Sequence, residues 1–291
     1  MRTIRQDMIE ALGRGLAAAG PEKDKMLGYL GSLQNPDGGF RGRSTASDLY
    51  YSVFATEPLL TAGGGCDRSA LAGYLKTIDT SRLDFIHLCC LIRLMGNLNL
   101  LDEVMTTRLR ERLDSFRCAD GFFHHAEPAA RGSVYGAFMA MGAYQELYCT
   151  SGFGRLETFV NSFQNEDGSF GNDAQTAMGM VPATAAAMVM LRQAGCAVNP
   201  ASVQWLLSCM TDDGGMAVSP VMPVADLLST STALHSLRLA GVDLDPIREA
   251  TLRFVTSCLT DSGGFQAHAF DPSVDSEYTF YGILALGNLG E

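Results

Sequence analysis

Three aspartates stand directly before apolar, helix-forming segments, where their carboxylates are placed for acid–base chemistry. They are Asp48, Asp226 and Asp275, and Tyr278 lies three residues after the last of them. If the segments run side by side, these polar groups meet at one end of the molecule, where two opposed carboxylates could transfer protons or hydrolyse a glycosidic bond. An aspartate at the start of a helix also caps its unpaired backbone N–H groups. Asp226, Asp275 and Tyr278 are therefore the candidate catalytic residues, and helix capping is the alternative role of the aspartates.

The histidines and cysteines do not form a recognisable metal-binding or nucleophilic pattern. His124 and His125 are adjacent, with Glu127 two residues further on, and adjacent histidines point apart unless the loop is special. Asp84 and His87 are one helical turn apart and could form a pair on one helix face. The eight cysteines contain no Cys-x-x-Cys, and the chain has no Gly-x-Ser-x-Gly, Walker or dinucleotide-binding motif. No metal site is therefore predicted.

Charge and composition restrict the partners that the chain can bind. Its 21 Lys and Arg against 32 Asp and Glu give a net charge of −11, and no basic cluster offers a surface for nucleic acid or an anionic membrane. Residues 1–20 carry charges throughout, which predicts an amphipathic helix rather than a secretion signal. No apolar run reaches the roughly 18 residues of a membrane span. Together with cysteines that resemble small buried hydrophobes, these features favour a cytoplasmic protein.

One phrase returns along the chain: an apolar helix end, followed by Asp-Gly-Gly-Phe or a close variant. Its copies end at Phe40, Phe123, Phe170, Met216 and Phe265. The first two copies are nearly twice as far apart as the others, and the segment 74–96 fills that gap as a degenerate copy. This gives about six units of 40 to 50 residues, which is the signature of a repeat architecture.

Each unit contains two helices of different character. The first carries charges on one face, whereas the second, as in residues 182–191, is apolar nearly all round and must be buried on every side. The second helix begins after a capping Asp and ends at a glycine, as at Gly63, Gly241 and Gly290. Because neither end of the chain offers a polar capping unit, we expect the units to close. The sequence thus predicts an all-α domain over residues 1–291, an α/α toroid of inner and outer helices around an apolar cavity.

The repeat also carries a family resemblance. The run Tyr-Leu-x-x-x-Gln-x-x-x-Gly-Gly-Phe, residues 29–40, resembles the repeat of protein prenyltransferase β subunits and is related to the QW repeat of squalene–hopene and other class II terpene cyclases. The resemblance extends over about residues 25–290. It implies an α6–α6 barrel with a funnel-shaped apolar cavity, whose chemistry lies among the N-termini of the inner helices, where unpaired N–H groups favour anions.

The same resemblance shows which catalytic groups have changed. Protein prenyltransferases hold zinc with Asp-x-Cys and a later His. Here Asp226 aligns with the Asp, Leu228 replaces the Cys and Tyr278 replaces the His, so we expect no zinc cofactor. The loop 216–225 carries none of the basic residues that contact diphosphate in the family, and the Asp-x-Asp-Asp acid motif of terpene cyclases is absent.

The substrate-binding candidates are an arginine in the first unit and the residues expected at inner-helix starts and along the cavity wall. They are Arg43, Asp48, Tyr50, Tyr51, Phe54, Tyr135, Leu228 and Phe280. The resemblance implies a protein that binds an isoprenoid or another apolar small molecule, as a zinc-independent prenyltransferase or a terpene cyclase. A non-catalytic lipid- or protein-binding module, or a β-like subunit that needs a helical partner subunit, remains the alternative.

Overall fold

The computed structural model of the chain describes residues 2–125, 130–149, 153–174, 176 and 178–290. Its elements in chain order are α1 (Ile4–Ala18), η1 (Gly20–Glu22), α2 (Lys23–Ser32), α3 (Leu49–Thr61), α4 (Arg68–Thr77), η2 (Thr80–Arg82), α5 (Phe85–Asn97), α6 (Glu103–Asp114), α7 (Val134–Glu146), α8 (Leu156–Asn161), α9 (Val181–Gln193), α10 (Pro200–Ser208), α11 (Leu227–Leu239), α12 (Asp245–Ser257), β1 (Phe265–Gln266), β2 (Val274–Asp275) and α13 (Ser276–Leu289). Helices dominate, as predicted, and the two short strands form one antiparallel pair.

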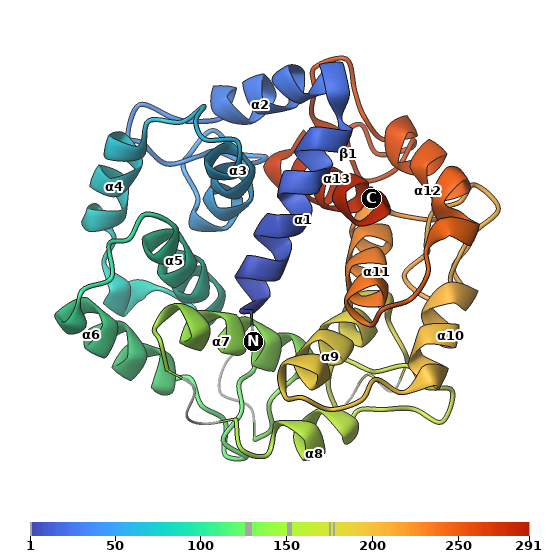
Figure 1. Cartoon of the computed structure of the whole chain (residues 1–291). Coiled ribbons are helices and arrows are strands. Elements are labelled where there is room, and N and C mark those ends of the chain that lie inside the picture. Colours follow the sequence, from blue (N-terminus) through green and yellow to red (C-terminus); the bar gives the residue numbers. More distant parts are fainter. Residues whose placement is uncertain (1, 126–129, 150–152, 175, 177, 291) are drawn as a thin grey trace.

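The helices form two concentric rings. Helices α3, α5, α7, α9, α11 and α13 form the inner ring, and α2, α4, α6, α8, α10 and α12 lie outside it (Figure 1). Each inner helix packs on the next, and α13 contacts both α11 and α3, so the ring is closed. The predicted toroid of six two-helix units is therefore confirmed.

The repeated Gly-Phe phrase fixes each outer-to-inner connection. The residue at the end of the phrase is fully buried, and in four units its backbone N–H donates to a hydroxyl in the first turn or so of the following inner helix. These pairs are Phe40 with Ser52, Phe170 with Thr184, Met216 with Thr230 and Phe265 with Thr279, at 2.8–3.1 Å. The phrase thus ties the turn to the inner ring and sets where each inner helix begins.

Gly214 shows why the turn requires glycine. Its φ is +88°, and a Cβ there would lie 2.4 Å from the backbone carbonyl carbon of Ala250 on α12. An L-residue pays about 1–2 kcal/mol for this conformation alone. We expect Gly214→Ala to lower the free energy of unfolding by at least about 2 kcal/mol, because the clash adds to that cost. Chemical denaturation would test this, with Gly73→Ala on α4 as control, since nothing lies within 4 Å of a Cβ at that exposed position. Equal effects of the two changes would contradict the prediction.

The aspartates before the inner helices act as N-caps. The side chain of Asp48 accepts hydrogen bonds from the N–H groups of Tyr50 and Tyr51, that of Asp226 from Ser229, and that of Asp275 from Tyr278. The capping role that the sequence allowed is thus present in all three. These first turns, whose N–H groups the aspartates cap, lie together at one end of the ring.

Helix α1 lies outside the six-unit pattern and crosses the other end of the ring (Figure 1). It packs most closely on α13, where glycines allow the two backbones to touch: a Cβ on Gly15 would lie 1.9 Å from the carbonyl oxygen of Ile283, and one on Gly287 would lie 1.7 Å from that of Ala11. The guanidinium of Arg14 adds a hydrogen bond to the carbonyl of Gly287. The amphipathic helix predicted for residues 1–20 is confirmed, and it lies across one end of the ring.

Candidate functional site

A cavity of about 340 Å³ runs along the axis of the ring. Its wall follows one face of the inner helices in three tiers, at the second, at the fifth and sixth, and at the ninth and tenth helical positions. The first tier is Tyr50, Tyr135, Pro182, Leu228 and Glu277; the middle tier is Val53, Phe54, Cys89, Cys90, Phe138, Met139, Ala185, Ala186, Thr232, Phe280 and Tyr281; the third tier is Arg93, Gly142, Ala143, Val189, His235 and Leu284. Ile4 and Met8 of α1 complete the lining. We call the end at the first tier the mouth and the end at α1 the floor.

The mouth contains a carboxyl group within the apolar wall. Glu277 lines the cavity, and its Oε1 accepts a hydrogen bond of 2.6 Å from the hydroxyl of Tyr50 on α3. Burial raises the pKa of Glu277, and the Tyr50 hydrogen bond opposes that rise because it favours the carboxylate. The hydroxyls of Tyr135 and Tyr281 are close enough for the negative charge of Glu277 to raise their pKa further, after burial. A partly buried acid thus lies among tyrosines of the first and middle tiers.

The middle tier is rich in aromatic rings. Phe54 is the centre of a cluster, with ring centroids 4.9 Å from Tyr50, 5.2 Å from Phe280 and 5.7 Å from Tyr281. On the neighbouring helix α5 Cys90 lines the cavity, and burial raises the pKa of its thiol to about 12, so it is a neutral packing group rather than a nucleophile. This part of the cavity offers apolar surface and aromatic faces, and it suits a hydrocarbon chain.

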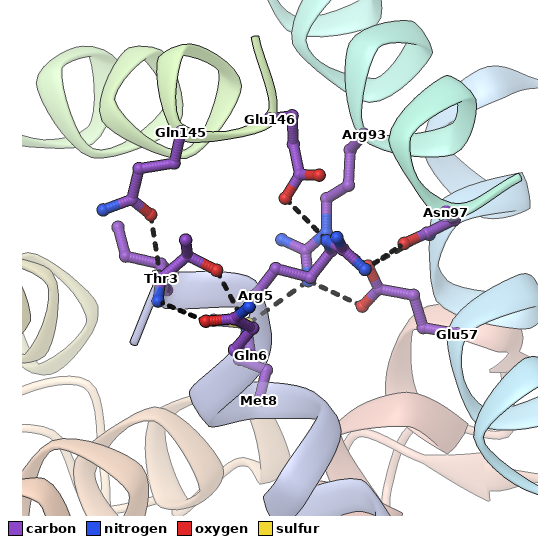
Figure 2. A network of polar contacts seen from close by, with 10 residues as sticks. Thr3, Arg5, Gln6, Met8, Glu57, Arg93, Asn97, Gln145 and Glu146 are labelled. Atoms are coloured by element: carbon purple, nitrogen blue, oxygen red, sulfur yellow. Dashed lines mark hydrogen bonds and ion pairs between the residues drawn. The ribbon is translucent and has the colours of Figure 1, made fainter. Parts of the chain in front are cut away.

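A network of ion pairs and hydrogen bonds joins α1 to the inner helices at the floor (Figure 2). Arg93 of α5 binds both carboxylate oxygens of Glu57, at 2.5 and 2.6 Å, and contacts the sulfur of Met8 at 3.3 Å. Arg5 of α1 binds Glu146 at the end of α7, at 2.6 Å. Glu57 and Glu146 are 1% and 6% exposed, so these arginines are the cations that balance two buried carboxylates.

A second polar cluster lies outside the cavity, at the N-terminal end of α13. Asp275 is 1% exposed, and its Oδ2 accepts a hydrogen bond of 2.9 Å from Nε of Arg43, whose side chain is half exposed. The guanidinium lies over the ring of Tyr278, 5.6 Å from its centroid. The backbone carbonyl of Tyr51 accepts from the hydroxyl of Ser276, which joins α3 to α13. Arg43, Asp275, Tyr278 and Tyr51 therefore form a cluster beside the mouth and are not part of the cavity wall.

Asp48 belongs to a third cluster. The ring of His87 lies between Asp84, 2.8 Å from Nδ1, and Asp48, 3.4 Å from Nε2. The hydrogen bond with Asp48 is the largest of the influences that raise the pKa of His87 to about 9, so the ring is protonated at neutral pH and joins α3 to α5. The Asp84–His87 pair that the sequence allowed is present, on an exposed edge rather than in the core.

The residues at the family's zinc positions do not suit zinc. Both carboxylate oxygens of Asp226 are engaged by Ser229, through its N–H and its hydroxyl at 2.7 Å each. Leu228 offers only a hydrocarbon side chain to the cavity, and Tyr278 packs under Arg43. Within the described residues, no three His, Cys, Asp or Glu side chains are grouped to hold a metal ion. His124 and His125 stack at 4.6 Å between ring centroids, and Glu127 is outside the described residues.

The structure divides the sequence candidates into two groups. Tyr50, Phe54, Tyr135, Leu228 and Phe280 line the cavity. Asp226, Asp275, Tyr278, Arg43, Asp48 and Tyr51 surround the helix N-termini without lining it. The sequence analysis missed Glu277, Arg93 and His235. Glu277 could have been found, because it occupies the same second helical position as Tyr50, Tyr135 and Leu228.

The comparisons with known proteins agree with this architecture. The family model of the prenyltransferase alpha-alpha toroid domain matches residues 7–199 and 185–289. The chain belongs to this family. No curated protein matches the toroid in sequence.

Solved structures share the fold of the toroid at low identity. The type II terpene cyclase MstE from Scytonema, without ligand, is 14% identical over 97% of both chains, with a TM-score of 0.62. A variant of that cyclase in complex with geranylgeranyl dihydroxybenzoate gives the same values. The Candida albicans protein geranylgeranyltransferase-I complexed with GGPP is 15% identical over 75% of this chain and 70% of that chain, with a TM-score of 0.57. In the described part of the toroid, no helix is long and apolar enough to cross a membrane.

Proposed function

We propose that this toroid binds a linear isoprenoid in its central cavity and cyclises it by protonation, with Glu277 as the general acid. The observation that carries the proposal is the carboxyl of Glu277 at the mouth of a cavity that is otherwise apolar and aromatic. Burial raises the pKa of Glu277 and so favours the protonated acid, which is the form that a general acid must hold before reaction.

The Glu277–Tyr50 pair supplies both the proton and the means to release it. Tyr50 donates to Oε1 of Glu277, which leaves Oε2 to hold the proton. When that proton passes to a carbon of a ligand double bond, the double-bond electrons form the new C–H bond and the adjacent carbon becomes a cation. The Tyr50 hydroxyl then stabilises the carboxylate that is left, since a hydrogen bond to a charged acceptor is stronger than one to a neutral acid.

The aromatic middle tier suits the cation that follows. Faces of Phe54, Phe280 and Tyr281 carry negative charge density, and a cation near such a face gains about 0.5–2 kcal/mol per ring. Burial raises the pKa of the Cys89 and Cys90 thiols of the wall, so they stay protonated and do not capture the cation. Ring closure by a second double bond of the ligand is the reaction that such a wall favours.

The relatives of known structure support this substrate class. MstE is a terpene cyclase solved with geranylgeranyl dihydroxybenzoate, and the geranylgeranyltransferase was solved with GGPP. An acid in the cavity wall favours cyclisation by protonation. Zinc-dependent prenyl transfer is disfavoured, because the residues at the prenyltransferase zinc positions do not suit zinc.

The test is conversion of defined isoprenoids in heavy water. The protein would be incubated in D₂O with farnesyl diphosphate, geranylgeranyl diphosphate or geranylgeranyl dihydroxybenzoate, and the products analysed by mass spectrometry. We expect a cyclic product with one deuterium delivered at the protonated carbon. Tight binding of these compounds without conversion would overturn the proposed catalysis and leave a carrier of isoprenoids.

The pH dependence of the reaction provides a second prediction. Activity needs protonated Glu277, so it falls as the pH rises through the raised pKa of this acid. Tyr50→Phe removes a hydrogen bond that lowers this pKa, so the falling limb should move to higher pH while kcat drops about 10–100-fold. A pH–rate profile of both proteins measures this. A limb that moves to lower pH would show that Tyr50 does not act on Glu277.

The proposed reaction uses no metal ion, and we expect the purified protein to contain no stoichiometric zinc. The reason is the chemistry of the three family positions, where Leu228 and Tyr278 replace thiolate and imidazole. Elemental analysis would check this. A value of about one zinc per chain would contradict the prediction and direct attention to His124 and His125.

A further inference from the structure

Arg93 is a cation in the third tier of the cavity wall, and part of its side chain is accessible. It lines the cavity with 23% of its side-chain surface exposed, whereas the side chain of Glu57 is fully covered. Nε and Nη2 of the guanidinium bind the two oxygens of Glu57, and Nη2 also contacts the sulfur of Met8. Within the described residues no group accepts from Nη1, and this nitrogen is not fully buried. Nη1 is therefore the donor that Arg93 can offer to a ligand.

Two other polar groups of the wall below the mouth cannot take this role. The Nε2 atom of His235 has no accessible surface for a ligand to reach. The hydroxyl of Thr232 already donates to the carbonyl of Leu228. Because the remaining side chains of the third tier are aliphatic or absent, a ligand oxygen at this depth would find its hydrogen bond at Arg93.

The charges around Nη1 are balanced before a ligand arrives. Glu57 neutralises Arg93, Glu146 neutralises Arg5, and both carboxylates are almost fully buried. A neutral oxygen needs only a hydrogen bond from such a pair. A diphosphate would bring several negative charges to a cation that is already paired, and burying an unbalanced charge is costly. The floor therefore favours a neutral oxygen acceptor over an anionic head group.

We propose that Arg93 is the head-group site of the cavity, where Nη1 donates to the neutral oxygen of an isoprenoid alcohol or carbonyl compound. This inference rests on the proposed function. Arg93 and Glu277 are at the ninth and second positions of inner helices that begin at the same end of the ring, so they are separated by roughly 10 Å along the axis at a rise of about 1.5 Å per residue. With the oxygen at the floor, the hydrocarbon tail extends to the mouth and brings its far double bond to Glu277.

The volume of the cavity indicates the length of that tail. An apolar cavity of about 150 Å³ holds one benzene ring. At the same space per carbon, the cavity of about 340 Å³ accommodates roughly 14 carbons, which is close to a farnesyl chain. Farnesol is therefore the probe, and farnesene, a hydrocarbon with the same number of carbons and no oxygen, is its counterpart.

The test compares ligands with and without the oxygen. Binding of farnesol, farnesene and farnesyl diphosphate to the full chain would be measured by competition with a fluorescent apolar dye. We expect the protein to bind farnesol about 10–100-fold more tightly than farnesene, which is the effect of one hydrogen bond from a charged donor. It should also bind farnesol at least about tenfold more tightly than the diphosphate, because the diphosphate charge is not balanced at the floor.

A double variant removes the donor without leaving a buried charge. Arg93→Met alone leaves Glu57 unpaired, so Glu57→Leu is added, and this variant should bind farnesol and farnesene within about threefold of each other. The matched control is Arg5→Met with Glu146→Leu, which removes the other ion pair of the floor and no residue of the cavity wall. The control should keep the preference for farnesol. Melting temperatures would confirm that both variants are folded.

Each outcome decides for or against the head-group site. Loss of the farnesol preference in the Arg93 double variant alone supports it. A preference retained in that variant, a preference lost equally in the control, or a parent that binds the diphosphate as tightly as farnesol overturns it. The ranking of the three ligands by the parent tests the proposal even where a variant does not fold.

The proposed function is judged separately, by conversion in heavy water. Farnesol that is bound with the expected preference but is not cyclised overturns the Glu277 acid and leaves Arg93 as the head-group site of an isoprenoid carrier. Farnesol that is cyclised without such a preference overturns the head-group site alone. A parent that binds none of the three ligands overturns both proposals.

Discussion

Replacing Glu277 by Gln is expected to lower kcat by about 10²–10⁴-fold, the range that general acids contribute. Glutamine has nearly the same shape and can still accept the hydrogen bond of Tyr50, but it has no acidic proton to give. The loss should appear in single-turnover kinetics at every pH, because no titration of glutamine restores it. Retained activity would show that another group protonates the ligand.

The same variant should remain folded, because Glu277 lowers the stability of the folded protein when it loses its proton. The folded-state pKa of Glu277 is raised, so the folded protein holds this proton more tightly than the unfolded chain, and stability falls as the pH rises through the raised value. A glutamine cannot ionise, so the Glu277→Gln variant escapes this loss of stability and should be at least as stable as the parent at neutral pH. Glu249→Gln on the surface of α12 is the matched control and should change neither rate nor stability.

Replacing Arg93 by Met should cause the largest loss of stability, about 3–5 kcal/mol. The variant leaves the carboxylate of Glu57 buried at 1% exposure without its cation, and it removes the contact with Met8 of α1. For a protein of this size the melting temperature should fall by on the order of 10 °C. The double variant Glu57→Leu with Arg93→Met should recover much of the loss, because apolar pairs can replace buried ion pairs at little cost.

An exposed ion pair provides the comparison. Arg253 binds Glu249 on α12, with side chains 65% and 92% exposed, and Arg253→Met should cost less than about 1 kcal/mol. Thermal unfolding of the single and double variants measures both effects. If Arg93→Met costs no more than Arg253→Met, the floor network contributes little to the closure of the ring.

Much of the fold is determined by the sequence itself, because the repeat depends on local conformation. The Gly-Gly-Phe turns need positive φ, and a capping Asp and an apolar run identify each inner helix wherever it lies. Closure could be deduced from the apolar end helices. Five cavity residues, Tyr50, Phe54, Tyr135, Leu228 and Phe280, followed from the same pattern.

The polar site depended on tertiary structure. Asp226 and Asp275 attracted notice because aspartate is a common acid, yet in the folded ring they cap helices and engage neighbours beside the cavity. Glu277, two residues after Asp275, shares the second helical position of Tyr50 and Tyr135, but the packed ring was needed to show that this position faces inward. The ring of His235 pairs through Nδ1 with Asn288, which is 53 residues away in sequence. The sequence by itself determined a ring of helices with an apolar lumen. The tertiary structure alone decided which few polar groups face that lumen, because helix rotation and long-range contacts are set by packing.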